Sequence, residues 1–464
     1  MTRRTQGSLA IFVPLLVIGA IVAVGIWQGI GTGTMPELTD AAPTKVIAPE
    51  GVKGRFEERG QQRVLTLWGT PYERGYAQGF ILADVIVRGI EHDFERVLKP
   101  FIPTYESVVR RGVVPKFAFS ERELAEMEGL YAGLEAKLSE EERIVKGLDR
   151  PFDLTDIKAL NTFGDWYGLG CSSLAAWGPR TKDGKPIVGR NFDFPGFYLL
   201  VEETYVVVRA ADGDAQGQVG VSYPGCIGTL TGMNPAGVFV AVHDVRIKPT
   251  LDKAMRPNVP RLLAVRRLLE QTEGAEACIQ ALELARAWPT LYGNNFMVVA
   301  PTASDTAPHA AVLEYDCRLD MEGGCTMRLG NALEGDDSES AAGCLACTNH
   351  HRNRTKPEGY SELYERWRFP LLAVGDDEAA ATPAPFDVAA MWDRMNRVSF
   401  PRKGTQQLAT SIRGPKRAHG TLHQVVGEPG HARLHVRLGA VGKHIRDAET
   451  GVYDVPKRVR DAAK

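Results

Sequence analysis

Cys171 stands in a setting that suits a nucleophile created by backbone cleavage. It follows Gly170, and the segment Gly-Arg-Asn-Phe-Asp at residues 189–193 later supplies Arg190 and Asp193. A cysteine thiol has a pKa of about 8.5 and an α-amino group a pKa of about 7.7–8.0, so the amine of an N-terminal cysteine is a suitable base beside its own sulfur. That amine exists only if the bond between Gly170 and Cys171 is cut.

The cut itself can be intramolecular. The Cys171 thiol attacks the Gly170 carbonyl, the acyl group shifts from nitrogen to sulfur, and water hydrolyses the thioester; glycine tolerates the strained backbone that this needs. The Arg190 guanidinium could lower the thiol pKa and hold the Asp193 carboxylate, which could hold the new ammonium group. An oxyanion hole would need an amide side chain and a backbone N–H, each worth roughly 3–4 kcal/mol. These residues predict a precursor that cuts itself and works as two pieces.

Short motifs from Leu67 onward, taken in order, resemble the N-terminal-nucleophile (Ntn) hydrolases related to acyl-CoA:6-aminopenicillanic acid acyltransferase. More distantly they resemble bile salt hydrolase, penicillin V acylase, acid ceramidase and the N-acylethanolamine amidase. The motifs lie at residues 69–79 (beginning Gly-x-x-Tyr-Glu-x-Gly), Asn161 and Asp165, 170–173 (Gly-Cys-Ser-Ser), 182–185, 189–193, 232–238, 348–350 (Thr-Asn-His) and 421–423 (Thr-Leu-His).

The resemblance implies a role for each matching residue. Cys171 would be the nucleophile and, through its amine, the base, while Arg190 and Asp193 would organise the thiol and the amine. Asn349 would donate its side-chain amide to the oxyanion. The resemblance also implies an αββα sandwich, with two antiparallel sheets between helical layers, and neither a metal nor an organic cofactor.

The second oxyanion donor departs from the family pattern. Relatives have an asparagine in the segment after Gly237, where this chain has His243 and Asp244. Both are candidates for contact with the oxyanion or the substrate. His243 could equally be a buried histidine whose hydrogen bonds are satisfied within the fold.

The elements around these residues predict an α+β layered fold. A strand at residues 63–69 is followed by helices with apolar residues at helical spacing, and after Cys171 short β-rich runs dominate. The expected helices cover residues 71–87, 121–138, 154–162, 260–272 and 275–287. The expected strands after Cys171 cover residues 186–190, 203–210, 218–223, 238–242, 296–300, 311–315, 422–426 and 434–438.

The N-terminal segment predicts a membrane anchor. Residues 9–30 carry no charge, and about 20 apolar residues span a bilayer. Arg3 and Arg4 should stay in the cytoplasm, which gives a single-pass protein with its catalytic part on the outer (periplasmic or extracellular) side. An export signal read through the two arginines is the alternative.

Four segments follow from these expectations: residues 1–30 as cytoplasmic tip and transmembrane signal-anchor, 31–62 as linker, 63–170 as a helical pro-segment, and 171–464 as the catalytic chain. No cysteine precedes residue 171. The two cleaved fragments are therefore expected to stay associated through packing.

Composition and cysteine spacing limit the alternatives. A net charge of −2 provides no general attraction to nucleic acid. Besides Cys171 there are six cysteines, enough for three disulfides outside the cytoplasm, and Cys317 with Cys325 is the best pair. Cys226 and Cys278 could instead be buried free thiols. The Cys and His residues at 344–351 are too crowded for an ordinary zinc site.

The expected reaction is hydrolysis of an amide in a small N-acylated or lipid-like substrate, through an acyl-thioester on Cys171. Transfer of the acyl group to an amine, as in the penicillin acyltransferase, and a phospholipase B-like hydrolysis of lipid acyl groups are the enzymatic alternatives. A membrane-tethered binding protein, or a disulfide-rich exported domain without catalysis, would leave Cys171 as an ordinary buried cysteine.

Overall fold

The computed structural model describes residues 37–38, 42–94, 102–165, 170–194, 202–245, 257–290, 292–316, 324–330, 343–354, 384–399, 420–439 and 445–464. The predicted membrane span at residues 9–30 lies outside these ranges. None of the helices within them combines the length and the apolar character needed to cross a bilayer.

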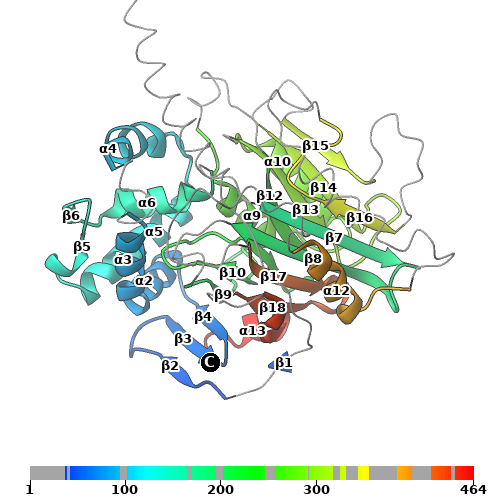
Figure 1. Cartoon of the computed structure of the whole chain (residues 1–464), viewed down its shortest axis with the longest axis horizontal. Helices are drawn as coiled ribbons and strands as arrows, with labels where there is room; N and C mark the ends of the chain where they lie inside the picture. The colour runs from blue at the N-terminus through cyan, green and yellow to red at the C-terminus, as the bar shows by residue number, and fades with distance from the viewer. Residues whose placement is uncertain are drawn as a thin grey trace, which may run out of the picture.

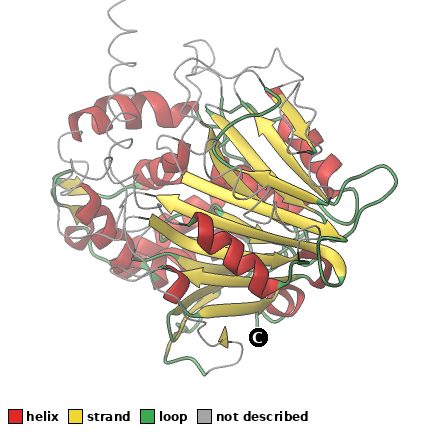
Figure 2. Ribbon diagram, turned by 45° about the vertical axis from the view of Figure 1, so that its right-hand side comes forward, coloured by secondary structure: helices red, strands yellow, loops and turns green. Residues whose placement is uncertain are grey.

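Two β-sheets packed face to face form the centre of the molecule (Figures 1 and 2). The seven-stranded sheet has the order β1-β19-β18-β17-β8-β7-β16, and the ten-stranded sheet has the order β15-β14-β13-β12-β11-β10-β9-β4-β3-β2. The first sheet consists of β1 (Glu37–Leu38), β19 (Thr450–Asp454), β18 (Arg433–Leu438), β17 (Gly420–Glu428), β8 (Gly184–Phe194), β7 (Gly170–Gly178) and β16 (Cys344–Cys347). The second consists of β15 (Cys325–Arg328), β14 (Ala310–Tyr315), β13 (Gly293–Val299), β12 (Phe239–Val245), β11 (Thr231–Met233), β10 (Gln218–Ser222), β9 (Tyr205–Arg209), β4 (Gln62–Leu67), β3 (Gly54–Arg59) and β2 (Lys45–Ile47).

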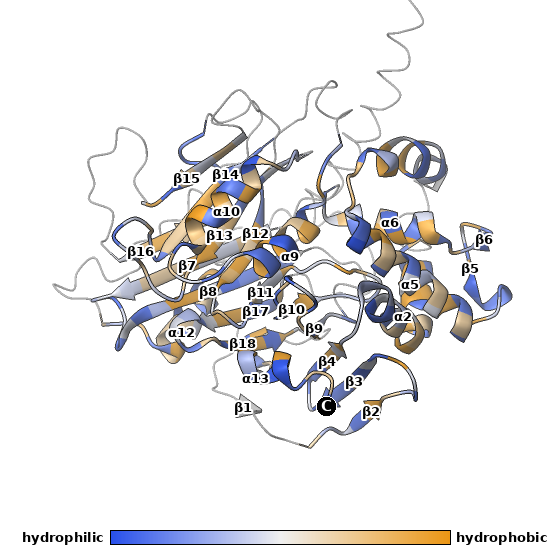
Figure 3. Ribbon diagram, turned by 180° about the vertical axis from the view of Figure 1, so that it is seen from behind, coloured by the Kyte–Doolittle hydropathy of each residue, from blue (hydrophilic) through white to orange (hydrophobic). Residues whose placement is uncertain are grey.

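Helices cover the outer faces of both sheets, which gives a mixed α+β sandwich. On the ten-stranded sheet, α9 (Arg261–Gln271) and α10 (Ala277–Arg286) pack against β11 to β14. On the other sheet, α12 (Val388–Val398) packs against β7, β8 and β17. The strands between these layers are rich in apolar residues, which are orange in Figure 3, for example in β13 and β14. Contacts of β7 with β12 and of β14 with β16 join the two inner faces.

The segment before Cys171 folds onto one side of this sandwich (Figure 1). It contains α2 (Pro71–Ile81), α3 (Ala83–Asp93), α4 (Ile102–Thr104), α5 (Glu121–Lys137) and α6 (Leu154–Thr162), and the small hairpin β5 (Ile144–Val145) and β6 (Arg150–Pro151). Short helices at Tyr105–Val113 (η3), Val114–Lys116 (η4), Glu141–Arg143 (η5) and Phe163–Asp165 (η6) connect them. The C-terminal segment adds η10 (Pro429–His431), η11 (Ile445–Asp447) and α13 (Val455–Arg460).

Glycine explains how closely α2 and α5 approach each other. A Cβ atom at Gly75 would lie 1.8 Å from the carbonyl oxygen of Glu126, and one at Gly129 would lie 2.1 Å from that of Tyr72. Any side chain at either position would drive the two backbones apart. The helix pair is therefore built for contact between backbones, and it fixes Glu126 near the sandwich.

Most predicted elements are confirmed, with two corrections. The helix expected over residues 71–87 is divided at Leu82, whose ψ of 15° departs from helical geometry. The prediction that residues 31–62 form a simple linker is wrong, because β2 and β3 lie within them and extend the ten-stranded sheet. Their charged residues hid the strand pattern: Lys45 of β2 pairs with Glu58 of β3 at 3.0 Å across the two strands.

The 63–170 segment also contributes more than helices. Its strand β4 lies inside the ten-stranded sheet, parallel to β9, with Val64 opposite Val206 and Leu67 opposite Arg209. A cut before Cys171 would thus leave two fragments that share a sheet.

Candidate active site

Cys171 lies at the start of β7 and faces the space between the two sheets. Its position in register with Phe192 of β8 puts both side chains on the same face. The side chain of Cys171 is completely buried. Burial raises the pKa of its thiol, the Arg190 guanidinium acts in the opposite direction, and the negative charge of Asp193 adds to the rise.

Arg190 connects the sulfur to both sheets. Its Nη2 donates to Cys171 Sγ at 3.2 Å and to the carbonyl oxygen of Val242 in β12 at 2.6 Å, while Nη1 donates to the carbonyl oxygen of Asn191 at 2.7 Å. The guanidinium carbon lies 5.2 Å from the ring centre of Phe192. Fixed by these contacts, the cation is held beside the sulfur without freedom to turn away.

Asn349 holds the peptide nitrogen that self-cleavage would release. Its side-chain oxygen accepts a hydrogen bond from the Cys171 N–H at 2.7 Å, and its Nδ2 donates to the carbonyl oxygen of Asp244 at 2.8 Å. The orientation of the amide follows from these partners, because a peptide N–H can only donate and a carbonyl can only accept. Asn295 of β13 supports the loop by donating to the carbonyl oxygens of Thr348 and His350 at 3.0 and 2.7 Å.

Asp193 lies opposite Gly170 in the ladder between β7 and β8, next to the predicted cut. Thr421 Oγ1 lies within hydrogen-bond distance of its carboxylate and of the carbonyl oxygen of Ser399, and its single proton is shared between these two acceptors. The prediction that Arg190 holds the Asp193 carboxylate is wrong. Among the described residues, the Arg190 guanidinium binds Cys171 Sγ and the carbonyl oxygens of Asn191 and Val242 instead. Successive residues of a strand face opposite sides, so positions 190 and 193 do not share a face.

His243 and Asp244 lie in β12, across the space from Cys171. The ring nitrogens of His243 both have partners: Nε2 lies 2.8 Å from Ser173 Oγ and Nδ1 lies 3.2 Å from the Asn295 carbonyl oxygen. Burial and then the Arg190 charge hold the pKa of His243 well below its usual value, so the ring is neutral. The Asp244 carboxylate is bound by Arg261. A role of either residue at the oxyanion stays a prediction.

A buried chain of charges links the segment before Cys171 to Asn349, and the sequence did not indicate Arg261, its central member. The backbone N–H of Arg261, the first residue of α9, donates to Asp165 Oδ2 at 3.1 Å, and its guanidinium binds both Asp165 and Asp244. Asp244 in turn accepts from Asn349 through its carbonyl oxygen. Burial raises the pKa of Asp165 to about 6, although Arg261 opposes the rise. Asp165 belongs to one of the sequence motifs. Arg261 does not, and an arginine at the start of a helix gives no indication in the sequence that it bridges two carboxylates.

Six of the seven cysteines lie in described residues, and no disulfide joins any two of them. Cys226 and Cys278 are therefore buried free thiols, one of the two expected outcomes. Cys317, predicted to pair with Cys325, lies outside the described ranges. Within the described ranges, no group of three or more His, Cys, Asp or Glu side chains is placed to hold a metal ion.

No protein-family model matches the chain, and no curated protein matches its sequence significantly. Solved structures do match. The N-acylethanolamine-hydrolyzing acid amidase ortholog of Caenorhabditis elegans is 18% identical, with 61% of this chain and 100% of that one covered at a TM-score of 0.35. Penicillin V acylase from Agrobacterium tumefaciens is 16% identical, covering 58% of this chain and 83% of that one at a TM-score of 0.35. A variant of the conjugated bile acid hydrolase from Clostridium perfringens is 14% identical, covering 61% and 96% at a TM-score of 0.35.

These structural neighbours are Ntn-hydrolase family members, the group that the sequence motifs resemble. Their identity to this chain is low and the TM-scores are modest.

Proposed function

We propose that the chain is a self-cleaving cysteine amidohydrolase of the Ntn type, which breaks an N-acyl amide bond through an acyl-thioester on Cys171. One observation carries the proposal. The sulfur and the peptide nitrogen of the same residue each have a dedicated partner: Arg190 at 3.2 Å from Sγ and Asn349 at 2.7 Å from the N–H. A structural cysteine needs neither contact.

In the precursor, Cys171 Sγ attacks the Gly170 carbonyl carbon and the bond from that carbon to the Cys171 nitrogen breaks. The thiol proton moves to the departing nitrogen, which becomes the α-amine, and water then hydrolyses the Gly170 thioester. Arg190 stabilises the attacking thiolate because a charge-assisted hydrogen bond favours the ionised form. Asn349 keeps the nitrogen in place while the bond to Gly170 breaks.

In the processed enzyme, the new amine takes the role of the base. It accepts the thiol proton as Sγ attacks the substrate carbonyl and returns a proton to the departing amine, which leaves an acyl-thioester on Cys171. Water activated by the same amine then releases the acid. Asn349 Oδ1 and the nearby Asp193 carboxylate, next to Gly170 in the ladder, suit the orientation and stabilisation of an ammonium group.

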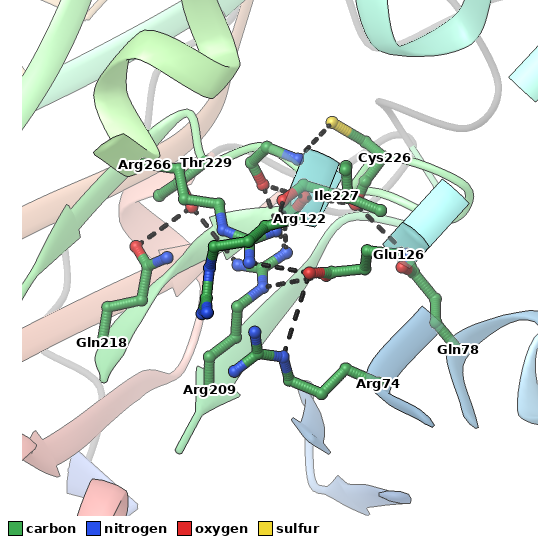
Figure 4. A network of polar contacts seen from close by, with 12 residues as sticks. Arg74, Gln78, Arg122, Glu126, Arg209, Gln218, Cys226, Ile227, Thr229 and Arg266 are labelled. Carbon is green, nitrogen blue, oxygen red and sulfur yellow. Dashed lines mark hydrogen bonds and ion pairs between the residues drawn. The ribbon is translucent and has the colours of Figure 1, made fainter. Parts of the chain in front are cut away.

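We further propose that packing and a buried ion cluster hold the two fragments together. Glu126 of α5 is surrounded by three guanidinium groups (Figure 4): Arg74 of α2 at 3.8 Å, Arg209 of β9 at 3.8 Å and Arg266 of α9 at 2.7 Å. Burial acts to raise the pKa of Glu126, but the three cations outweigh it and lower the pKa below its usual value. Arg209 and Arg266 follow the cut and Glu126 precedes it, so the cluster would join the fragments.

The proposed substrate is a small N-acylated or lipid-like molecule. The predicted membrane span at residues 9–30 supports a lipid-like acyl group, since it would keep the enzyme on the outer side of a membrane. Acyl transfer to an amine differs from hydrolysis only in the acceptor that attacks the thioester.

A panel of N-acyl amides with acyl groups of increasing length tests the proposal. The wild-type protein should release amine from at least one member, and Cys171→Ala should release none. Cys226→Ala, which removes another buried thiol far along the chain, should keep the activity. Hydroxylamine should divert the acyl group to a hydroxamate, because it attacks the acyl-thioester on Cys171 in place of water. Equal turnover by Cys171→Ala and the wild type, or no turnover of any member by the wild type, would contradict the proposal.

A further inference from the structure

A row of polar side chains crosses the outer face of the seven-stranded sheet, behind Cys171. Ser172, Asn191, Gln424, Arg437 and Thr450 are paired in register across β7, β8, β17, β18 and β19. Directly opposed residues of antiparallel strands share a face. Ser172 follows Cys171 in the strand, so the row faces away from the cleavage site and toward α12.

The row is only partly satisfied. Under α12, Asn191 Nδ2 donates to the Met395 carbonyl oxygen at 2.8 Å, and Gln424 Nε2 donates to Asn191 Oδ1 at 3.0 Å. Three buried atoms of the row nevertheless have no hydrogen-bond partner: Ser172 Oγ, Gln424 Oε1 and Arg437 Nη1. Buried polar groups are nearly always paired, and the arginine is the most costly exception because it carries a charge.

Arg437 is held in place but lacks an anion. Its side chain is 6% exposed, its Nε donates to Thr450 Oγ1 at 2.9 Å, and its guanidinium lies 4.2 Å from the ring centre of Trp392 in α12. No carboxylate of the described residues forms an ion pair with it. Burial lowers its pKa to about 10, while Asp447, farther away, acts in the opposite direction. A buried charge without a counter-ion is unfavourable, so the surroundings are arranged for an anion that comes from elsewhere.

A cavity of about 920 Å³ adjoins this arginine, between α12 and the strands of the outer face. Its wall includes Arg437, Lys185, Trp392, Ile187 and Phe386. The four acidic residues of the wall are each paired with another basic side chain: Asp183 with His431, Asp387 with Lys182, Asp393 with Arg397 and Glu428 with His435. None of these four carboxylates forms an ion pair with Arg437.

We propose that this cavity binds a small molecule that presents an oxyanion, a carboxylate or a phosphate group, to Arg437 and an apolar body to Trp392 and Ile187. The planar guanidinium suits either group, and the volume lies in the range of small-molecule sites. The site lies on the opposite face of the sheet from Cys171. It is therefore separate from the proposed active site, and binding there does not depend on catalysis.

Isothermal titration of the full chain with benzoate, phenyl phosphate and neutral benzamide tests the proposal. Benzoate or phenyl phosphate should bind with one site per chain, and benzamide should bind at least tenfold more weakly. The tighter of the two anions identifies the preferred group. Arg437→Gln should weaken the anion at least tenfold, whereas Arg433→Gln, at the exposed end of the same strand, should leave its affinity within twofold.

Hydrogen exchange of the wild-type protein gives a second readout that needs no variant. Benzoate or phenyl phosphate should slow exchange in peptides from β18 and α12, on either side of the cavity. The proposal is overturned if neither anion binds the wild type, if Arg437→Gln binds it with unchanged affinity, or if protection falls only elsewhere.

Discussion

Replacing Arg190 by glutamine removes a cation that contacts the Cys171 sulfur and keeps a side chain that can still donate to the Val242 carbonyl. A hydrogen bond to a charged group is worth about 1.5–3 kcal/mol. Since one pKa unit corresponds to 1.36 kcal/mol, the thiol pKa should rise by about 1–2 units. Self-cleavage near pH 7 should then slow about 10- to 100-fold, because the thiolate becomes correspondingly rarer.

The assay follows disappearance of the full-length chain after cell-free synthesis, at several pH values. The deficit of Arg190→Gln should stay constant while the pH is below the raised thiol pKa of the wild type, and shrink once the pH exceeds it, because the wild-type thiolate then stops increasing. Arg328→Gln is the matched control: this buried arginine also connects the two sheets, donating to the Ala346 carbonyl oxygen at 2.8 Å, but it does not touch Cys171. Cleavage of Arg190→Gln at the wild-type rate, an undiminished deficit above the thiol pKa of the wild type, or an equal effect of the control would refute the reasoning.

Three further predictions concern the surroundings of the site. Asn349→Asp should slow self-cleavage at least tenfold, because a carboxylate oxygen would then face the Asp244 carbonyl; a wild-type rate on a denaturing gel would count against the role of the amide. Glu126→Gln should lower the free energy of unfolding by about 3–5 kcal/mol, because three buried cations lose their carboxylate. The fragments of the processed protein should then separate at a lower urea concentration in size-exclusion chromatography. An unchanged urea midpoint of separation would show that the cluster does not hold the fragments together. Asp165 has a folded pKa of about 6 against an ordinary value of 3.8, so the native form binds its proton more tightly and the associated stability is lost as the pH rises from about 4 through 6. The unfolding free energy of the wild type relative to Asp165→Asn should therefore fall by up to about 3 kcal/mol over that window in urea titrations, and a difference independent of pH would contradict it.

Helices and strands whose apolar residues recur at regular spacing could be predicted from the sequence. The helices α5 and α6 and most strands after Cys171 lie where the spacing predicts them, because burial on one face imposes that spacing. Strands whose exposed faces are charged were not recognised. In β3, four charged residues and one glycine accompany a single buried aromatic residue, Phe56, so the strand depends on its partners in the sheet.

The site divides in the same way. Cys171 and Asn349 could be predicted to meet because both belong to motifs, although residues 178 positions apart give no distance of their own. The bridge through Arg261 could not be predicted, since it depends on where α9 begins relative to β12. The polar row that contains Arg437 could not be predicted either, because its members come together only through the register of four pairs of strands.

The most direct test of the central claim is the mass and N-terminal sequence of the purified protein. Self-cleavage predicts a fragment that ends at Gly170 and a second that begins Cys-Ser-Ser at Cys171 and runs to Lys464. Cys171→Ala should give a single uncut chain, while Cys226→Ala should be processed as the wild type. An intact wild-type chain, or a cut at the same bond in Cys171→Ala, would contradict the account.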